Sequence, residues 1–155
     1  TMHYLARMLE GGEDPMFIAR RIVIQASEEV GLANNNALNV AVSAMNAVHQ
    51  IGMPESRIIL AQAALTVALS PKSNTSYMAI NSAIEDVKNI DIGVVPMHLR
   101  NAEIAGMDEH GYGKGYKYPH DYEYSKVEQQ YLPDKLIGKK YFIPKKWEKN
   151  LGEDL

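Results

Sequence analysis

The stretch Ile58-Ile-Leu-Ala-Gln-Ala-Ala-Leu-Thr-Val-Ala-Leu69 decides how the rest of this chain folds. It is apolar nearly all round a helix, because Gln62, Thr66 and Ser70 follow one another at a spacing of four and form one thin polar line. A helix that is apolar on every side is buried on every side. At about 1.5 Å per residue it is also too short for a comfortable membrane span. We therefore expect a central helix or one half covered by a partner subunit, and its alanines slightly favour the partner.

Four further helices are predicted around this one from their start and stop signals. Residues 2–10 end at a glycine pair, and Asp14-Pro15 is an N-cap followed by proline in the first turn of a helix that closes at Gly31. One of the asparagines at 34–36 caps a third helix that ends at Gly52. The fourth helix runs from Pro54 to about Ser70. A fifth begins at 73 or 74, and four of its residues are expected to face inward: Tyr77, Ile80, Ile84 and Val87.

The last third of the chain is rich in Tyr, Gly, Lys and Pro and cannot be a continuous helix. Residues 92–96 should be extended, 102–110 should form a short helix, and one helical turn is expected around Lys126–Tyr131. Seven of the nine tyrosines lie beyond residue 110, and we expect their rings to be buried against the helices: Tyr112, Tyr116, Tyr118, Tyr122, Tyr124, Tyr131 and Tyr141. The predicted fold is therefore all-α, with about five main helices over 1–110 and an irregular tail over 111–155 packed on them as one domain.

Composition indicates a globular protein without disulfides. The chain has 155 residues, of which 46% are hydrophobic, and its formal net charge is −3. It has no cysteine and no long apolar run, so neither a disulfide framework nor a membrane span or signal peptide is expected. This composition fits a cytoplasmic protein with no membrane partner.

No catalytic motif stands out. The five histidines are scattered, without the spacing of a metal site, and the acid pairs fall near helix ends. Gly106 and Gly111 have the glycine spacing of a phosphate loop, but Tyr112 stands where the loop needs its lysine. We therefore expect no catalytic residue, metal or cofactor in this chain, which alone does not look like an enzyme.

The tail suggests a nucleic-acid-binding module as an alternative. Residues 111–149 hold nine lysines against five acids, and lysines next to tyrosines can contact phosphates while the rings stack on bases. The simpler interpretation is that these lysines only solvate an irregular surface. The candidate contacts for DNA or a partner are Arg100, Lys114, Tyr116, Lys117, Lys139 and Lys140.

Several runs of sequence resemble the C-terminal region of the RarA/MgsA family, AAA+ ATPases related to clamp loaders and to the Werner-helicase-interacting protein. The resemblance rests on motifs that follow one another along nearly the whole chain: Tyr4-Leu-Ala-Arg-Met-Leu-Glu-Gly-Gly-Glu-Asp-Pro15, Ser27-Glu-Glu-Val-Gly-Leu-Ala33, His98-Leu-Arg-Asn-Ala102, Gly111-Tyr-Gly-Lys-Gly-Tyr-Lys-Tyr118 and Gly138-Lys-Lys-Tyr141.

The resemblance implies that this chain is a C-terminal fragment and that the ATP and Mg²⁺ sites lie in an N-terminal ATPase module. Residues 1–110 would then be a helical collar that holds subunits together, and the implied assembly is a homotetramer. The full proteins act at replication forks and in recombination-linked repair. They bind DNA and single-stranded-DNA-binding protein in the bacterial cytoplasm, in association with the nucleoid.

Overall fold

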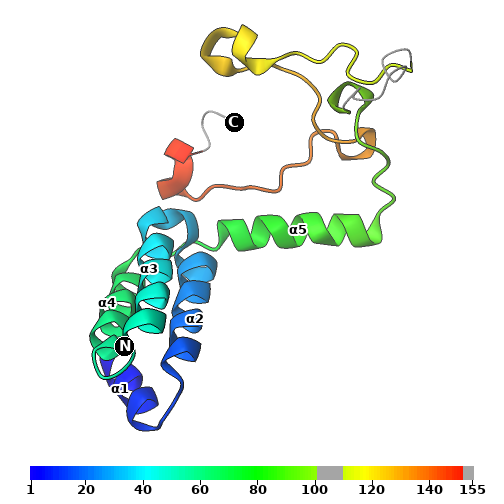
Figure 1. The fold of residues 1–155 in the computed structure, drawn as a ribbon. Coiled ribbons are helices and arrows are strands. Elements are labelled where there is room, and N and C mark those ends of the chain that lie inside the picture. The colour runs from blue at the N-terminus through cyan, green and yellow to red at the C-terminus, as the bar shows by residue number, and fades with distance from the viewer. Residues whose placement is uncertain (101–109, 152–155) are drawn as a thin grey trace. The chain divides into compact units, whose positions relative to one another are not determined.

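The structure is a computed structural model that describes residues 1–100 and 110–151. The described residues form α-helices, short helical turns and loops, with no strand, which confirms the predicted all-α class (Figure 1). Five α-helices lie in the described part of the chain: α1 (Met2–Glu10), α2 (Pro15–Gln25), α3 (Asn35–Ile51), α4 (Ser56–Leu69) and α5 (Thr75–Asn89).

The starts of α2 and α3 follow the predicted capping. The Asp14 carboxylate accepts hydrogen bonds from the backbone N–H groups of Met16 and Phe17 at 3.0 and 3.1 Å, which starts α2. The Asn34 side chain accepts from the N–H of Asn36 at 3.1 Å and starts α3. The second helix departs from regular α geometry at its end, where residues Ala26–Val30 form a π-helical turn before Gly31.

Helices α1 to α4 pack side by side around one apolar core (Figure 1). Leu5 of α1, Ile18 of α2, Val48 of α3 and Leu60 of α4 are all buried and form one cluster. Complete burial of side chains of this size stabilises the fold by roughly 1.5–3 kcal/mol each.

Helix α4 is not buried all round within one chain. Leu60 and Ala63 face the core, but Ile58 and Leu69 are 63% and 81% exposed. Burial on every side is therefore wrong within one chain, although α4 does contact α1, α2 and α3 as a central helix should. Cover by a partner subunit, the other half of the expectation, stays a prediction.

The inward face predicted for α5 is wrong. All four residues expected inside are at least 41% exposed: Tyr77, Ile80, Ile84 and Val87. The physical reason is that α5 makes no more than marginal contact with any other α-helix in the described part of the chain. Its helical period is as expected, but the described residues leave its apolar side exposed.

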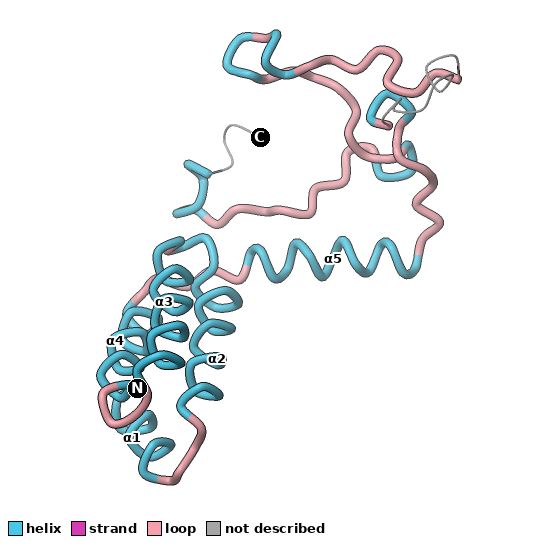
Figure 2. The backbone as a smooth tube through the Cα atoms, in the orientation of Figure 1, coloured by secondary structure: helices cyan, strands magenta, loops and turns pink. Residues whose placement is uncertain are grey.

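Contacts within the chain divide it into two compact units, one of Thr1–Asn81 with Tyr141–Leu155 and one of Ser82–Lys140. The predicted division into 1–110 and 111–155 stays a prediction. Within the second unit, short 3-10 turns at Met97–Leu99, Pro119–Asp121, Glu123–Ser125 and Asp134–Leu136 are joined by loops (Figure 2).

Three expectations for the tail have different outcomes. The helical turn around Lys126–Tyr131 is wrong, because Lys126 is extended and the turns lie on either side of that segment. The helix expected at 102–110 lies, except for residue 110, outside the described residues. In the part of the chain that the structure describes, Tyr112 and Tyr141 are half-buried, and five tail tyrosines are 43–84% exposed: Tyr116, Tyr118, Tyr122, Tyr124 and Tyr131. These five belong to the second unit, so the expected burial of their rings against the helices of the first unit stays a prediction.

Candidate nucleic-acid and assembly surfaces

Arg100 is held in place by its own segment and by the glycine-rich turn that follows residue 110. Its Nε donates to the Val95 carbonyl at 2.8 Å, and its guanidinium lies 5.7 Å from the centre of the Tyr112 ring. The N–H of Gly113 donates to the Met97 carbonyl at 3.0 Å, which fixes this turn beside Arg100. The cation therefore has a defined position on the surface of the second unit.

Lys117 is held by hydrogen bonds to Glu128 and Gln129, whereas Lys114 and Tyr116 are exposed on the surface. The Lys117 Nζ donates to the Glu128 carbonyl at 2.9 Å, and the Gln129 amide bonds to both the N–H and the carbonyl of Lys117. Lys114 is exposed, and its side chain contacts no described residue through a hydrogen bond or ion pair. The Tyr116 ring is 45% exposed. These three predicted contacts and Arg100 therefore share one part of the unit.

Lys139 forms an ion pair with α5 and is not part of the group around Arg100. Its ammonium pairs with the carboxylate of Asp86 on α5 at 2.9 Å, and Asp86 is itself buried. Lys140 is exposed. Close to this segment, a hydrogen bond from Lys135, aided by the Gly93 N–H, holds the pKa of Asp91 below its usual value. The structure thus gives Lys139 a structural partner and links neither Lys139 nor Lys140 to the Arg100 group by any described contact.

Charge in the tyrosine-rich segment is balanced. Residues 111–131 carry three lysines and three acids, so the lysine excess of the tail comes from residues after 131. A polyanion is attracted by a concentrated positive field. The segment around Tyr116 and Lys117 therefore offers exposed rings without a cationic groove.

A buried carboxylate lies in the first unit, and the sequence analysis did not predict it. Glu148 is 1% exposed, and its two oxygens accept from the Thr75 hydroxyl at 2.9 Å and from the Lys145 N–H at 2.8 Å. Burial alone raises the pKa of Glu148, but hydrogen bonds from Ser73, the Lys145 N–H and Thr75, together with the Lys145 charge, outweigh it and lower the pKa. In the sequence Lys145-Lys-Trp-Glu-Lys149, Glu148 looks like any other solvated charged residue.

Neither a metal centre nor a membrane span is found in the part of the chain that the structure describes. No three His, Asp or Glu side chains gather there to hold an ion. None of the described helices has the length and apolarity that crossing a bilayer requires. The surfaces that remain for function are the exposed rings and lysines of the second unit and the exposed apolar faces of α4 and α5.

Comparison with known proteins identifies the family. The model of the family described as "MgsA AAA+ ATPase C terminal" matches residues 1–155. The chain belongs to this family. Replication-associated recombination protein A of Bacillus subtilis is 46% identical over 145 residues, which are 94% of this chain and 34% of that protein. The protein of the same name from Escherichia coli K12 is 36% identical over 161 residues, and the ATPase WRNIP1 of Dictyostelium discoideum is 41% identical over 143.

The match also limits what this chain represents. It spans about a third of the length of the bacterial relatives and 16% of the Dictyostelium protein. The resemblance to the RarA/MgsA family drawn from the sequence motifs is confirmed, and the family is one of AAA+ ATPases. The activity and partners of a longer protein are a matter for proposal.

Proposed function

We propose that this chain is the assembly region of a longer AAA+ ATPase that acts in DNA replication, recombination and repair. The family match and the names of the relatives support the setting. In this proposal the ATP and Mg²⁺ sites lie outside the chain, and the chain joins subunits into a clamp-loader-like homotetramer. DNA and single-stranded-DNA-binding protein would be partners of the longer protein.

The observation that carries the assembly role is the apolar surface that one chain leaves uncovered. Ile58, Leu65 and Leu69 of α4 are exposed, as are Ile80 and Val87 of α5. Single exposed apolar residues are normal, but successive turns of a helix that all expose them mark an interaction surface. An obligate contact should bury more than about 1,000 Å².

Light scattering of the purified chain at micromolar concentration tests the assembly role. We expect a mass near four chains that persists at high salt, because apolar contacts are not screened. A monomer mass would contradict the proposal.

The second candidate function is direct binding of single-stranded nucleic acid, favoured by the exposed rings of Tyr116 and Tyr118 next to Lys114. The charge balance of residues 111–131 predicts that such binding is weak. Anisotropy of a labelled oligonucleotide at 50 and 200 mM salt tests it, since binding through phosphates collapses over roughly this range.

A further inference from the structure

Helices α3 and α4 share a surface that is almost free of charge. Between residues 30 and 71 the only charged side chains are Glu55 and Arg57, although the chain's average of 23% charged residues would place about ten there. Helix α3 (Asn35–Ile51) has none. A surface that faces water usually carries interspersed charges, whereas the centre of a protein interface is depleted of them.

The exposed side of α3 is a row of neutral polar groups. Asn36, Asn39, Ser43, Asn46 and Gln50 recur every three or four residues, and all five are exposed. None of their side chains makes a hydrogen bond to a residue that the structure describes. Each amide both donates and accepts, and so does the serine hydroxyl, so the row offers hydrogen bonds of both kinds without charge.

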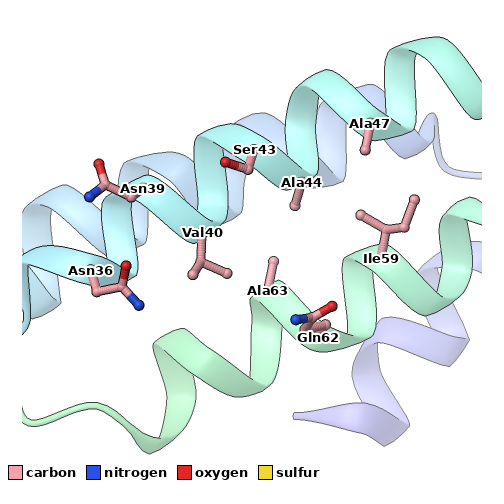
Figure 3. Close-up of a pocket in the computed structure, with 9 residues that line it drawn as sticks. All are labelled: Asn36, Asn39, Val40, Ser43, Ala44, Ala47, Ile59, Gln62 and Ala63. Atoms are coloured by element: carbon pink, nitrogen blue, oxygen red, sulfur yellow. The ribbon is translucent and has the colours of Figure 1, made fainter.

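A groove runs beside this row, between α3 and α4. It has a volume of about 370 Å³, and Val40 and Ala44 of α3 point in it toward Ala63 of α4 (Figure 3). Gln62 lines the groove from α4 and is in register with the exposed stripe of Ile58, Leu65 and Leu69. The amide row, the small-residue groove and the apolar stripe therefore form one continuous surface, which we name the α3–α4 face.

We propose that the α3–α4 face binds the same face of a second copy of this chain across a two-fold axis. The proposal rests on the assembly role above and specifies its surface. In a two-fold contact the same patch meets itself, so a row of like charges would repel, whereas amides and hydroxyls can pair with their own kind. The stripe of Ile58, Leu65 and Leu69 is covered in the same contact by its symmetry mate.

Charge also separates a second copy from other occupants. Nucleic acid requires a concentration of cations, and Arg57 is the one Lys or Arg that helices α3 and α4 themselves carry. A strongly acidic or basic protein would find no opposite field to pair with. The complement of the α3–α4 face is another neutral surface of similar composition, and the α3–α4 face of a second copy of this chain is such a surface.

The test places a charge in the middle of the face. Ser43→Glu introduces a good helix former at an exposed position. Ala6→Glu is its control, because Ala6 is exposed in the middle of α1 and lies on neither α3, α4 nor α5. We expect the mass of S43E in light scattering to fall at least two-fold at micromolar concentration, with helicity unchanged by circular dichroism. The mass of A6E should equal that of the original chain.

A mixing experiment distinguishes the loss of this interface from a folding defect. S43R should dissociate like S43E, and an equimolar mixture of the two should regain a larger mass, because opposite charges then meet across the axis. If the original chain is oligomeric but S43E and S43R keep its full mass, the α3–α4 face is not the interface, and the assembly role stands without it. A monomeric original chain would overturn both.

Discussion

The carboxylate of Glu148 accepts a hydrogen bond from the hydroxyl of Thr75, the first residue of α5, at 2.9 Å. Thr75 follows the loop between α4 and α5, whereas Glu148 comes 73 positions later in the chain. A second oxygen of the same carboxylate takes the Lys145 N–H. The segment after Tyr141 is thus anchored to the helical bundle through one buried acid, inside one compact unit.

Removing the charge of this acid should loosen the anchor. Glu148→Gln keeps the shape, but it replaces one acceptor oxygen by an NH₂ group that faces groups already donating. We expect a loss of about 1–3 kcal/mol in the free energy of unfolding, the usual result of breaking a buried hydrogen bond to a charged group. Urea unfolding followed by circular dichroism measures it. Glu123→Gln, at an exposed acid, should change stability by less than about 0.5 kcal/mol.

Acid should release the same segment. The pKa of Glu148 is lowered in the folded chain, so its stabilisation is fully present above the unfolded pKa of roughly 4.3 and is lost as pH falls through the lower folded value. Trp147 is the only tryptophan and lies next to Glu148, so its fluorescence reports on this segment. We expect its emission to change below about pH 4. An E148Q chain that shows the same acid transition would contradict the assignment to Glu148.

The sequence was sufficient wherever structure follows from local chemistry. The caps at Asp14 and Asn34 and the bounds of α1 were predictable, because a cap bonds to residues two or three positions away. The direction that α5 faces was not. Its apolar period says which residues share a side, but which surface covers that side depends on contacts far along the chain.

The same difference separates the candidate sites. Lys114 and Tyr116 are exposed as a polar tail suggests, whereas Lys139 pairs with Asp86 and Glu148 is buried. The Lys139–Asp86 and Glu148–Thr75 pairs each join residues more than fifty positions apart, so no local spacing pattern in the sequence predicts them. Five of the tail tyrosines lie exposed in the second unit, whereas most of the helices expected to cover them belong to the first unit, far away along the chain.

Gly31 should be the least replaceable glycine of the bundle. Its φ is +48°, and a Cβ there would lie 2.6 Å from the carbonyl oxygen of Ser73. Gly31→Ala therefore combines backbone strain with a clash against backbone that Glu29 holds through the Ser73 N–H. Gly12→Ala is the matched control, because its φ is +82° but the space around it is open. We expect about 1–2 kcal/mol lost in the control from strain alone and at least about 1 kcal/mol more for Gly31, measured by urea unfolding.

The chain alone should not hydrolyse ATP. Its sequence carries no phosphate loop with the required lysine, and the proposal places the nucleotide site in the rest of a longer protein. Phosphate release should stay at background with and without single-stranded DNA. Activity that follows the protein through successive purification steps and scales with its concentration would contradict this prediction.

Lysine substitutions should separate residues that contact DNA from residues that hold the fold. Lys114 and Lys140 are exposed, and neither makes a hydrogen bond or ion pair with a described residue, so their ammonium groups are available to phosphates. Lys114→Ala and Lys140→Ala should weaken binding of a single-stranded oligonucleotide equally for all base sequences. Each should also reduce the slope of log K against log salt by about 0.7.

Lys139→Ala should behave differently, because the Lys139 ammonium neutralises the buried Asp86 carboxylate at 2.9 Å. We expect it to lower the urea midpoint of the chain and to leave the salt slope unchanged. Anisotropy titrations at four salt concentrations, with urea unfolding of the same three variants, measure both effects. A K139A chain with unchanged stability and a reduced slope would place Lys139 on DNA and show that its pairing with Asp86 is dispensable.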